Sequence, residues 1–156
     1  RIATYNIWND DSDWARRLEA LADELNNLDA DVVAVQEAPV EVASHERFDE
    51  YFCRTTRYQH VLHFPYPESA DERPEGLAFL SKLPVEEARV YWEDIASTAN
   101  NWAVHIVLSR AGRSLSVTNV HLDWQYEAGR EQHIVPIIRD LVDSRPCNCD
   151  ILCGDF

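Results

Sequence analysis

The sequence predicts an α/β fold built from layers of sheet and helix. The chain opens with a β-rich run, continues into a segment with helical periodicity, and returns to a strand-like apolar run. This alternation is typical of sheets covered by helices. The 156 residues, 46% hydrophobic and 10% aromatic, are enough to build a hydrophobic core. We therefore expect a single domain over residues 1–156.

The first three elements follow from β propensity and hydrophobic periodicity. Arg1–Trp8 is rich in β-forming residues, and Asp11 or Ser12 in the polar stretch after it can cap a helix. An amphipathic helix is predicted next, because apolar residues recur at helical spacing. These residues are Trp14, Leu18, Leu21, Leu25 and Leu28. The continuous apolar run Val32–Val35 then predicts a strand covered on both faces.

The middle of the chain is predicted to be rich in strands. Ala38–Tyr58 is expected to form a helix followed by a loop, and Pro65–Pro74 an acidic, proline-rich loop. The strand candidates are Tyr58–Phe64, Gly76–Leu80, Val85–Trp92, Trp102–Leu108 and Leu115–Leu122. Ala111 and Gly112 mark a tight turn, so the last two strands should form an antiparallel hairpin.

Helical periodicity returns near the end of the chain. It covers Tyr126–Val142, where Pro136 predicts either a kink or a late start of the helix. Asp150–Cys153 is an apolar run that should form a last buried strand. Since a domain rarely stops on a buried strand, we expect the domain to be truncated at its C-terminal end.

Polar side chains stand at the ends of several predicted strands. They are Asn6, Glu37, His121 and Asp155 at strand ends, and Glu75 just before a strand. Sheets in α/β proteins carry their functional side chains at such ends. The sequence therefore predicts that these residues converge on one rim of the fold.

The chemical types of these residues fit the hydrolysis of a phosphate ester. Mg²⁺ prefers a few oxygen ligands together with water and substrate oxygens, which Glu37 with a helping Asn6 can supply. The ion would polarise a phosphoryl oxygen. The imidazole of His121 could donate a hydrogen bond to that oxygen or protonate the leaving group. The carboxylate of Asp155 could orient or deprotonate the attacking water.

Five segments carry a family resemblance. They are TYNIW (4–8), DVVAVQEA (31–38), EGLAFLSKLPV (75–85), TNVHLDW (118–124) and CGDF (153–156). Together, in this order and approximate spacing, they resemble the endonuclease/exonuclease/phosphatase superfamily of metal-dependent phosphohydrolases. That superfamily includes deoxyribonucleases, abasic-site endonucleases, neutral sphingomyelinases and inositol polyphosphate 5-phosphatases. The resemblance covers the whole chain.

The resemblance implies a four-layer sandwich of two mixed β-sheets flanked by helices, as in deoxyribonucleases. It also implies that Glu37 is the main ligand of Mg²⁺ or Mn²⁺, with Asn6 beside it. His121 would contact the scissile phosphate and be oriented by Glu75, and Asp155 would belong to a Gly-Asp-x-Asn motif. The Asn of that motif, a later Asp and a Ser-Asp-His segment carrying the principal base are not in the sequence. The chain alone is therefore expected to be nearly inactive.

The charge balance bears on the class of substrate. The chain has 14 basic and 28 acidic residues, a net charge of −14 at pH 7. A protein that holds duplex DNA through its phosphates needs a basic surface, so a small-molecule or lipid phosphoester is favoured over nucleic acid. The Trp and Tyr residues are scattered, and most are expected in the core rather than on a base-stacking platform. No apolar run is long enough to span a bilayer, and a monomer is expected.

Structural interpretations compete with this site. Asn6 could bond a neighbouring strand, and Glu37 could be a surface carboxylate. His121 could be a satisfied histidine at a strand end, and Glu75 could simply belong to the acidic loop. Asn119 could support the site or make a structural hydrogen bond equally well. The position of Glu37 directly after a buried run favours function.

Two alternatives of other classes remain open. The first is a catalytically silent binding or scaffold protein with the same fold, although such a protein has no chemical need for all the site residues. The second is a zinc module built on Cys147, Cys149 and Cys153. Their spacing lacks the paired C-x-x-C or His pattern of zinc sites. Their shared strand parity in an apolar run favours packing in the core.

Overall fold

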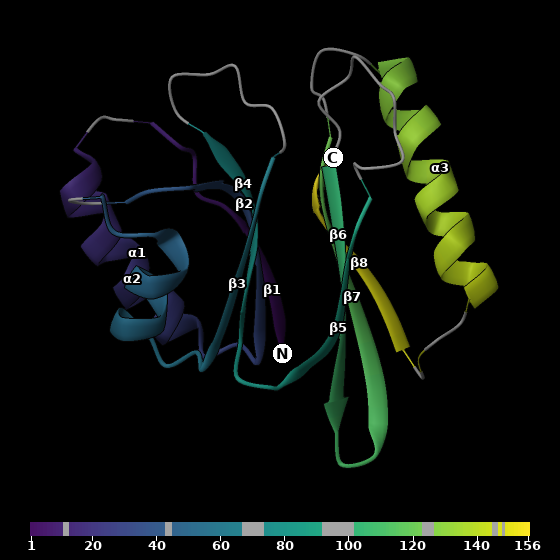
Figure 1. The fold of residues 1–156 in the computed structure, drawn as a ribbon, viewed down its shortest axis with the longest axis horizontal. Coiled ribbons are helices and arrows are strands. Elements are labelled where there is room, and N and C mark those ends of the chain that lie inside the picture. Colours follow the sequence, from purple (N-terminus) through teal and green to yellow (C-terminus); the bar gives the residue numbers. More distant parts are fainter. Residues whose placement is uncertain are drawn as a thin grey trace. The chain divides into compact units, whose positions relative to one another are not determined.

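The computed structural model describes residues 1–10, 13–42, 45–66, 74–91, 102–122, 127–144, 147 and 149–156. The chain divides into two compact units, Arg1–Leu83 and Pro84–Phe156. Each unit has a mixed four-stranded sheet, which carries two of the described helices in the first unit and one in the second (Figure 1). The predicted α/β class with two mixed sheets is therefore confirmed. The single domain with a truncated C-terminal end stays a prediction.

The first unit contains four strands and two helices. Its strands are β1 (Ile2–Asn6), β2 (Val32–Pro39), β3 (His60–Pro65) and β4 (Glu75–Ser81), and its helices are α1 (Trp14–Leu28) and α2 (Phe48–Thr55). The strand order is β1-β2-β4-β3, in which β1 runs parallel to β2 and the other neighbours are antiparallel. The predicted order of strand, helix and strand at the start of the chain is confirmed.

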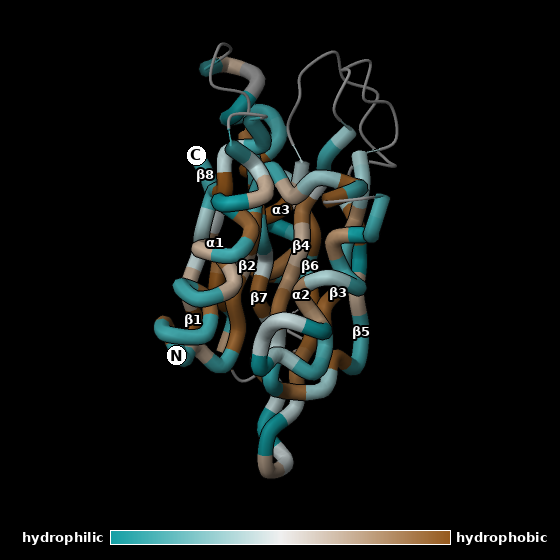
Figure 2. The backbone as a smooth tube through the Cα atoms, turned by 90° about the vertical axis from the view of Figure 1, so that its left-hand side faces the viewer, coloured by the Kyte–Doolittle hydropathy of each residue, from teal (hydrophilic) through white to brown (hydrophobic). Residues whose placement is uncertain are grey.

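The two helices of this unit bury their apolar faces on the sheet. The shared core contains Leu18, Leu21 and Leu25 of α1, Phe48 and Phe52 of α2, and Val33, Val35, Ala78 and Leu80 of the central strands. Hydrophobic colour runs along β2 and β4 (Figure 2). Val32 and Ala34, which point to the opposite face, are also fully buried. Coverage of this run on both faces, as predicted, is confirmed.

The segment after β2 differs from the prediction. The helix expected within Ala38–Tyr58 begins only at Phe48, because β2 runs on to Pro39. The strand continues through a bulge between Val35 and Ala38, which local periodicity does not reveal. The predicted caps Asp11 and Ser12 lie outside the described residues.

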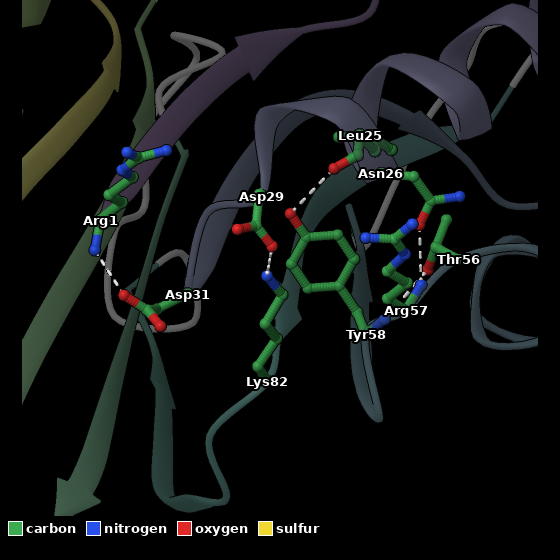
Figure 3. Close-up of polar contacts among 9 residues, drawn as sticks. All are labelled: Arg1, Leu25, Asn26, Asp29, Asp31, Thr56, Arg57, Tyr58 and Lys82. Carbon is green, nitrogen blue, oxygen red and sulfur yellow. Dashed lines mark hydrogen bonds and ion pairs between the residues drawn. The ribbon is translucent and has the colours of Figure 1, made fainter.

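Polar contacts tie the end of α1 to the start of β3 (Figure 3). The hydroxyl of Tyr58 donates to the carbonyl of Leu25 at 3.1 Å, and the backbone N–H of Arg57 donates to Asn26 Oδ1 at 2.9 Å. Lys82 pairs with Asp29 and lies 5.6 Å from the centre of the Tyr58 ring. Because Tyr58 is only 1% exposed, its hydroxyl satisfies a carbonyl at the end of α1 away from water.

Replacing Tyr58 with phenylalanine should lower the free energy of unfolding by about 1 kcal/mol, because the buried carbonyl of Leu25 loses its donor. Urea denaturation of the full-length protein measures this loss. Tyr58→Leu removes the ring as well and should be clearly more destabilising. Equal losses for the two variants would mean that the hydroxyl, and not the ring, carries the contribution.

The second unit contains four strands and one helix. They are β5 (Val85–Val90), β6 (Trp102–Arg110), β7 (Arg113–His121), α3 (Glu127–Ser144) and β8 (Cys149–Asp155). The strand order is β5-β6-β7-β8, and only β7 and β8 are parallel. Ala111 and Gly112 connect β6 to β7 with positive φ angles of 52° and 75°, so the predicted hairpin is confirmed. Ile137 and Leu141 of α3 pack on the sheet.

Two features of this unit differ from the prediction. Helix α3 begins at Glu127 and contains Pro136 in its interior, so the late start is wrong. Strand β8 is half-exposed rather than buried, because it lies at the end of the strand order with β7 as its neighbour. Cys149 on β8 is exposed, so its expected packing in the core is wrong, and Cys147 and Cys153 are only partly buried.

No helix in the described part of the chain is long and apolar enough to cross a bilayer.

Candidate functional site

Three of the predicted site residues meet at one edge of the first sheet. Asn6 ends β1 and pairs in register with Gln36, the residue before Glu37. Glu75 begins the antiparallel strand β4 and pairs with Pro39 at the end of β2. The ends of β1 and β2 and the start of β4 therefore lie at the same edge, which brings Asn6, Glu37 and Glu75 together.

Hydrogen bonds join these residues through a fourth one, Asn9. Asn6 Nδ2 donates to Glu37 Oε1 at 2.8 Å, and the backbone N–H of Asn9 donates to Glu37 Oε2 at 3.0 Å. The side chain of Asn9 donates to Glu75 Oε2 at 3.1 Å. Asn9 thus bridges the two carboxylates. The sequence analysis did not single out Asn9, and its position just after the first strand is the one signal that could have pointed to it.

The orientation of the Asn6 amide follows from its partners. Its Oδ1 accepts a hydrogen bond from the backbone N–H of Trp8 at 2.9 Å, while its Nδ2 faces Glu37. A backbone N–H can only donate and a carboxylate can only accept, so the reversed amide would lose both bonds. In this arrangement Asn6 orients Glu37. A direct metal-ligand role for Asn6 stays a prediction.

Glu37 has an unusual backbone conformation. Its φ is 56°, in the left-handed region, and it lies in the bulge of β2. In a regular strand its side chain would share the face of Val35, which the helices cover. The bulge breaks this alternation and redirects the carboxylate. Such a conformation costs about 1–3 kcal/mol and is concentrated at functional sites in proteins.

Tyr66 adds a neutral hydroxyl near the two carboxylates. Its backbone N–H donates to the carbonyl of Glu75 at 2.9 Å. Burial, and then the negative charges of Glu75 and Glu37, raise the pKa of Tyr66 well above its usual value. The phenol is therefore protonated across the physiological pH range and can act as a hydrogen-bond donor. The sequence did not single out Tyr66.

The donor set of this edge fits a hard divalent cation. Glu37 and Glu75 offer carboxylate oxygens, which suit Mg²⁺ or Mn²⁺. A carboxylate has about four acceptor sites, so the N–H contacts at Glu37 are compatible with an ion on the same group. Among the described residues no three His, Cys, Asp or Glu side chains form a cluster that could enclose an ion. Mg²⁺ is compatible with few protein ligands because it keeps several waters.

The other two predicted residues meet in the second unit. His121 ends β7 and Asp155 ends β8, and the parallel register pairs them directly. The backbone N–H of Leu122 donates to the carbonyl of Asp155 at 3.0 Å. His121 is half-buried and Asp155 is exposed. Asn119, two residues before His121, is fully buried in the strand, which is compatible with both of its interpretations.

The predicted site residues thus form two groups, one in each unit. The first group contains Asn6, Glu37 and Glu75, and the second contains His121 and Asp155. The orientation of His121 by Glu75 and the convergence of all five on one rim stay predictions. In the loops Asn9–Asp13, Pro65–Pro74 and Asp123–Gly129, residues 11–12, 67–73 and 123–126 lie outside the described part of the chain.

The comparison with known proteins covers residues of both units. The chain matches the sequence profile of the Endonuclease/Exonuclease/phosphatase family over residues 3–156. No curated protein sequence gives a significant match.

Several solved structures share the fold. A humanized D. rerio TDP2 is 19% identical with a TM-score of 0.70, and the match covers 99% of this chain and 60% of that one. The mannosyl-6-phosphatase Bt3783 of Bacteroides thetaiotaomicron is 18% identical with a TM-score of 0.75, covering 99% and 64%. An endonuclease/exonuclease/phosphatase from Bacteroides vulgatus is 17% identical with a TM-score of 0.79, covering 98% and 64%.

The chain spans about three-fifths of the length of these structures. The matched region includes both sheets and the three helices of the described residues, so the resemblance inferred from the five sequence segments is confirmed. The chain belongs to the endonuclease/exonuclease/phosphatase family.

Proposed function

We propose that the protein hydrolyses phosphoester bonds with the help of Mg²⁺ or Mn²⁺. The observation that supports this most directly is the carboxylate of Glu37, held by N–H donors of Asn6 and Asn9 on a strained bulge. A carboxylate oriented in advance on a rigid strand suits an ion that demands strict geometry. Membership of the family supports the same class of reaction.

Each residue has a role in this proposal. When bound, the ion would polarise a phosphoryl oxygen and offset negative charge in the transition state. Glu37 would hold the ion, and Asn6 and Asn9 would keep its carboxylate in place. His121 would donate a hydrogen bond to the phosphate, and Asp155 would orient the attacking water.

The net charge of −14 supports a small-molecule or lipid phosphoester as the substrate. A basic surface is what lets a protein release counterions from a nucleic acid, so a nuclease of the same family is the second candidate. A catalytically silent scaffold is the alternative from another class.

The test is hydrolysis of bis(p-nitrophenyl) phosphate and p-nitrophenyl phosphate by the full-length protein, with Mg²⁺, with Mn²⁺ and with EDTA. We expect turnover that requires the metal, and a loss of about 100-fold or more in kcat for His121→Ala. The ratio of the two rates ranks diester against monoester.

The matched control is His45→Ala, since His45 is exposed and its ring pairs with Glu41 rather than with a site residue. It should leave turnover unchanged. Turnover that persists in EDTA would contradict the metal requirement. If neither substrate is hydrolysed and calorimetry detects no Mn²⁺ binding, the scaffold alternative replaces this proposal.

A further inference from the structure

Trp8 is exposed in the turn after β1, between Asn6 and Asn9 in the chain. The residue is 62% exposed, whereas Trp14 and Trp102, the other described tryptophans, are partly buried. A side chain of this size usually stabilises the fold by being buried. Because Trp8 is mostly exposed, it loses most of this contribution. Trp8 is therefore an exception to the expectation that most tryptophans lie in the core.

The backbone of Trp8 is also strained. Its φ is 52°, in the left-handed region, which is a genuine outlier for a bulky side chain. Such conformations persist only where surrounding contacts impose them, and they concentrate at functional sites. Trp8 therefore combines two unfavourable features, exposure and strain, which calls for a role outside folding.

Arg17 of α1 holds the turn that carries Trp8. Its guanidinium donates to the carbonyls of Ile7, Trp8 and Asp10 at 2.7, 2.6 and 2.9 Å. The N–H of Asp10 also donates to the carbonyl of Trp8 at 2.8 Å. With the bond from its own N–H to Asn6, the backbone of Trp8 is fixed on both sides.

The same arginine also supports the indole ring. The Arg17 guanidinium carbon lies 5.3 Å from the centre of the Trp8 ring and 5.0 Å from that of Trp14. These are cation–π distances, so the ring of Trp8 is held against a fixed cation while most of its surface faces solvent. A ring held in this way is a platform on which a second ring can stack without loss of side-chain entropy.

The position of Trp8 connects this platform to the site. It lies between Asn6 and Asn9 in the chain, and both of these neighbours donate to the carboxylate of Glu37. We propose that Trp8 determines specificity by stacking on a ring in the phosphoester substrate. This inference rests on the proposed function, in which the phosphate binds next to Glu37. The substrate is then a phosphoester whose organic group carries a ring close to the phosphate.

The test compares phosphonates, which bind without turnover. Calorimetry with the full-length protein and Mg²⁺ measures the affinities for phenylphosphonate and methylphosphonate, which share the charged group and differ in the ring. We expect phenylphosphonate to bind at least about tenfold more tightly than methylphosphonate, which gives an affinity ratio of about ten or more. Trp8→Ala should reduce this ratio to about one without weakening methylphosphonate, and Trp8→Phe should largely restore it.

Further measurements identify the kind of ring that binds. They also distinguish failure of the role of Trp8 from failure of the proposed function. Glucose 6-phosphate against glycerol 3-phosphate, both of which can be hydrolysed, tests a sugar ring by the ratio of their kcat/KM values. Ile138→Ala, an exposed change on α3, should alter none of the ratios. Metal-dependent binding of all phosphonates with a ratio that Trp8→Ala leaves unchanged would overturn the role of Trp8 while the proposed function stands. Absence of metal-dependent binding to any of them would overturn both.

Discussion

Replacing Glu37 with glutamine should lower metal-dependent turnover by roughly 1,000-fold, because the ion loses the charge that holds it and with it several kcal/mol of transition-state stabilisation. Glutamine keeps the shape of the side chain but replaces one carboxylate oxygen with an N–H donor. Since Asn6 and Asn9 both present N–H groups to Glu37, one of them would then face another donor. Rates on bis(p-nitrophenyl) phosphate and the Mn²⁺ affinity from calorimetry check both effects.

Glu24→Gln provides the matched control for this substitution. Glu24 lies on the exposed side of α1, so the change removes the same charge at a distance from the site. It should leave turnover and Mn²⁺ affinity unchanged. Unaltered Mn²⁺ affinity in a folded Glu37→Gln variant would show that the ion binds elsewhere, and the assignment of this carboxylate would be wrong.

Replacing Gly154 with alanine should lower the free energy of unfolding by about 2–5 kcal/mol, through steric overlap and backbone strain together. A Cβ at this position would lie 2.0 Å from the carbonyl oxygen and 2.7 Å from the nitrogen of Val120 on β7. The φ of 141° adds strain for any side chain. Strand β8 would have to move away from β7, which also displaces Asp155 from its register with His121. Urea denaturation measures the loss.

The variant Gly112→Ala separates the effect of backbone strain from that of steric overlap. Gly112 also has a positive φ, 75°, but a Cβ there meets no atom within 4 Å. Only backbone strain remains, so the free energy of unfolding should fall by about 1 kcal/mol. Equal losses for the two variants would mean that the contact with Val120 contributes nothing.

Much of the fold was predictable from the sequence because its signals are local. The spacing of Leu18, Leu21 and Leu25 predicts α1, since residues three and four apart share one face of a helix. The run Val32–Val35 predicts a strand buried on both faces, and Ala111 with Gly112 predicts a hairpin. The candidate residues Asn6, Glu37 and Glu75 were also identified, because polar residues at the ends of apolar strands stand out without any knowledge of their neighbours.

Short-range patterns in the sequence thus predict most of the elements, the α/β class, the family resemblance and the candidate residues. How these residues act on each other depends on contacts between distant segments. Asn9 bonds to Glu75, which is 66 positions away, and the bulge at Glu37 arises from pairing between β2 and β4. The exposure of Trp8 and of Cys149 likewise depends on what packs over them. Such contacts form between segments distant in the chain, so no local pattern encodes them.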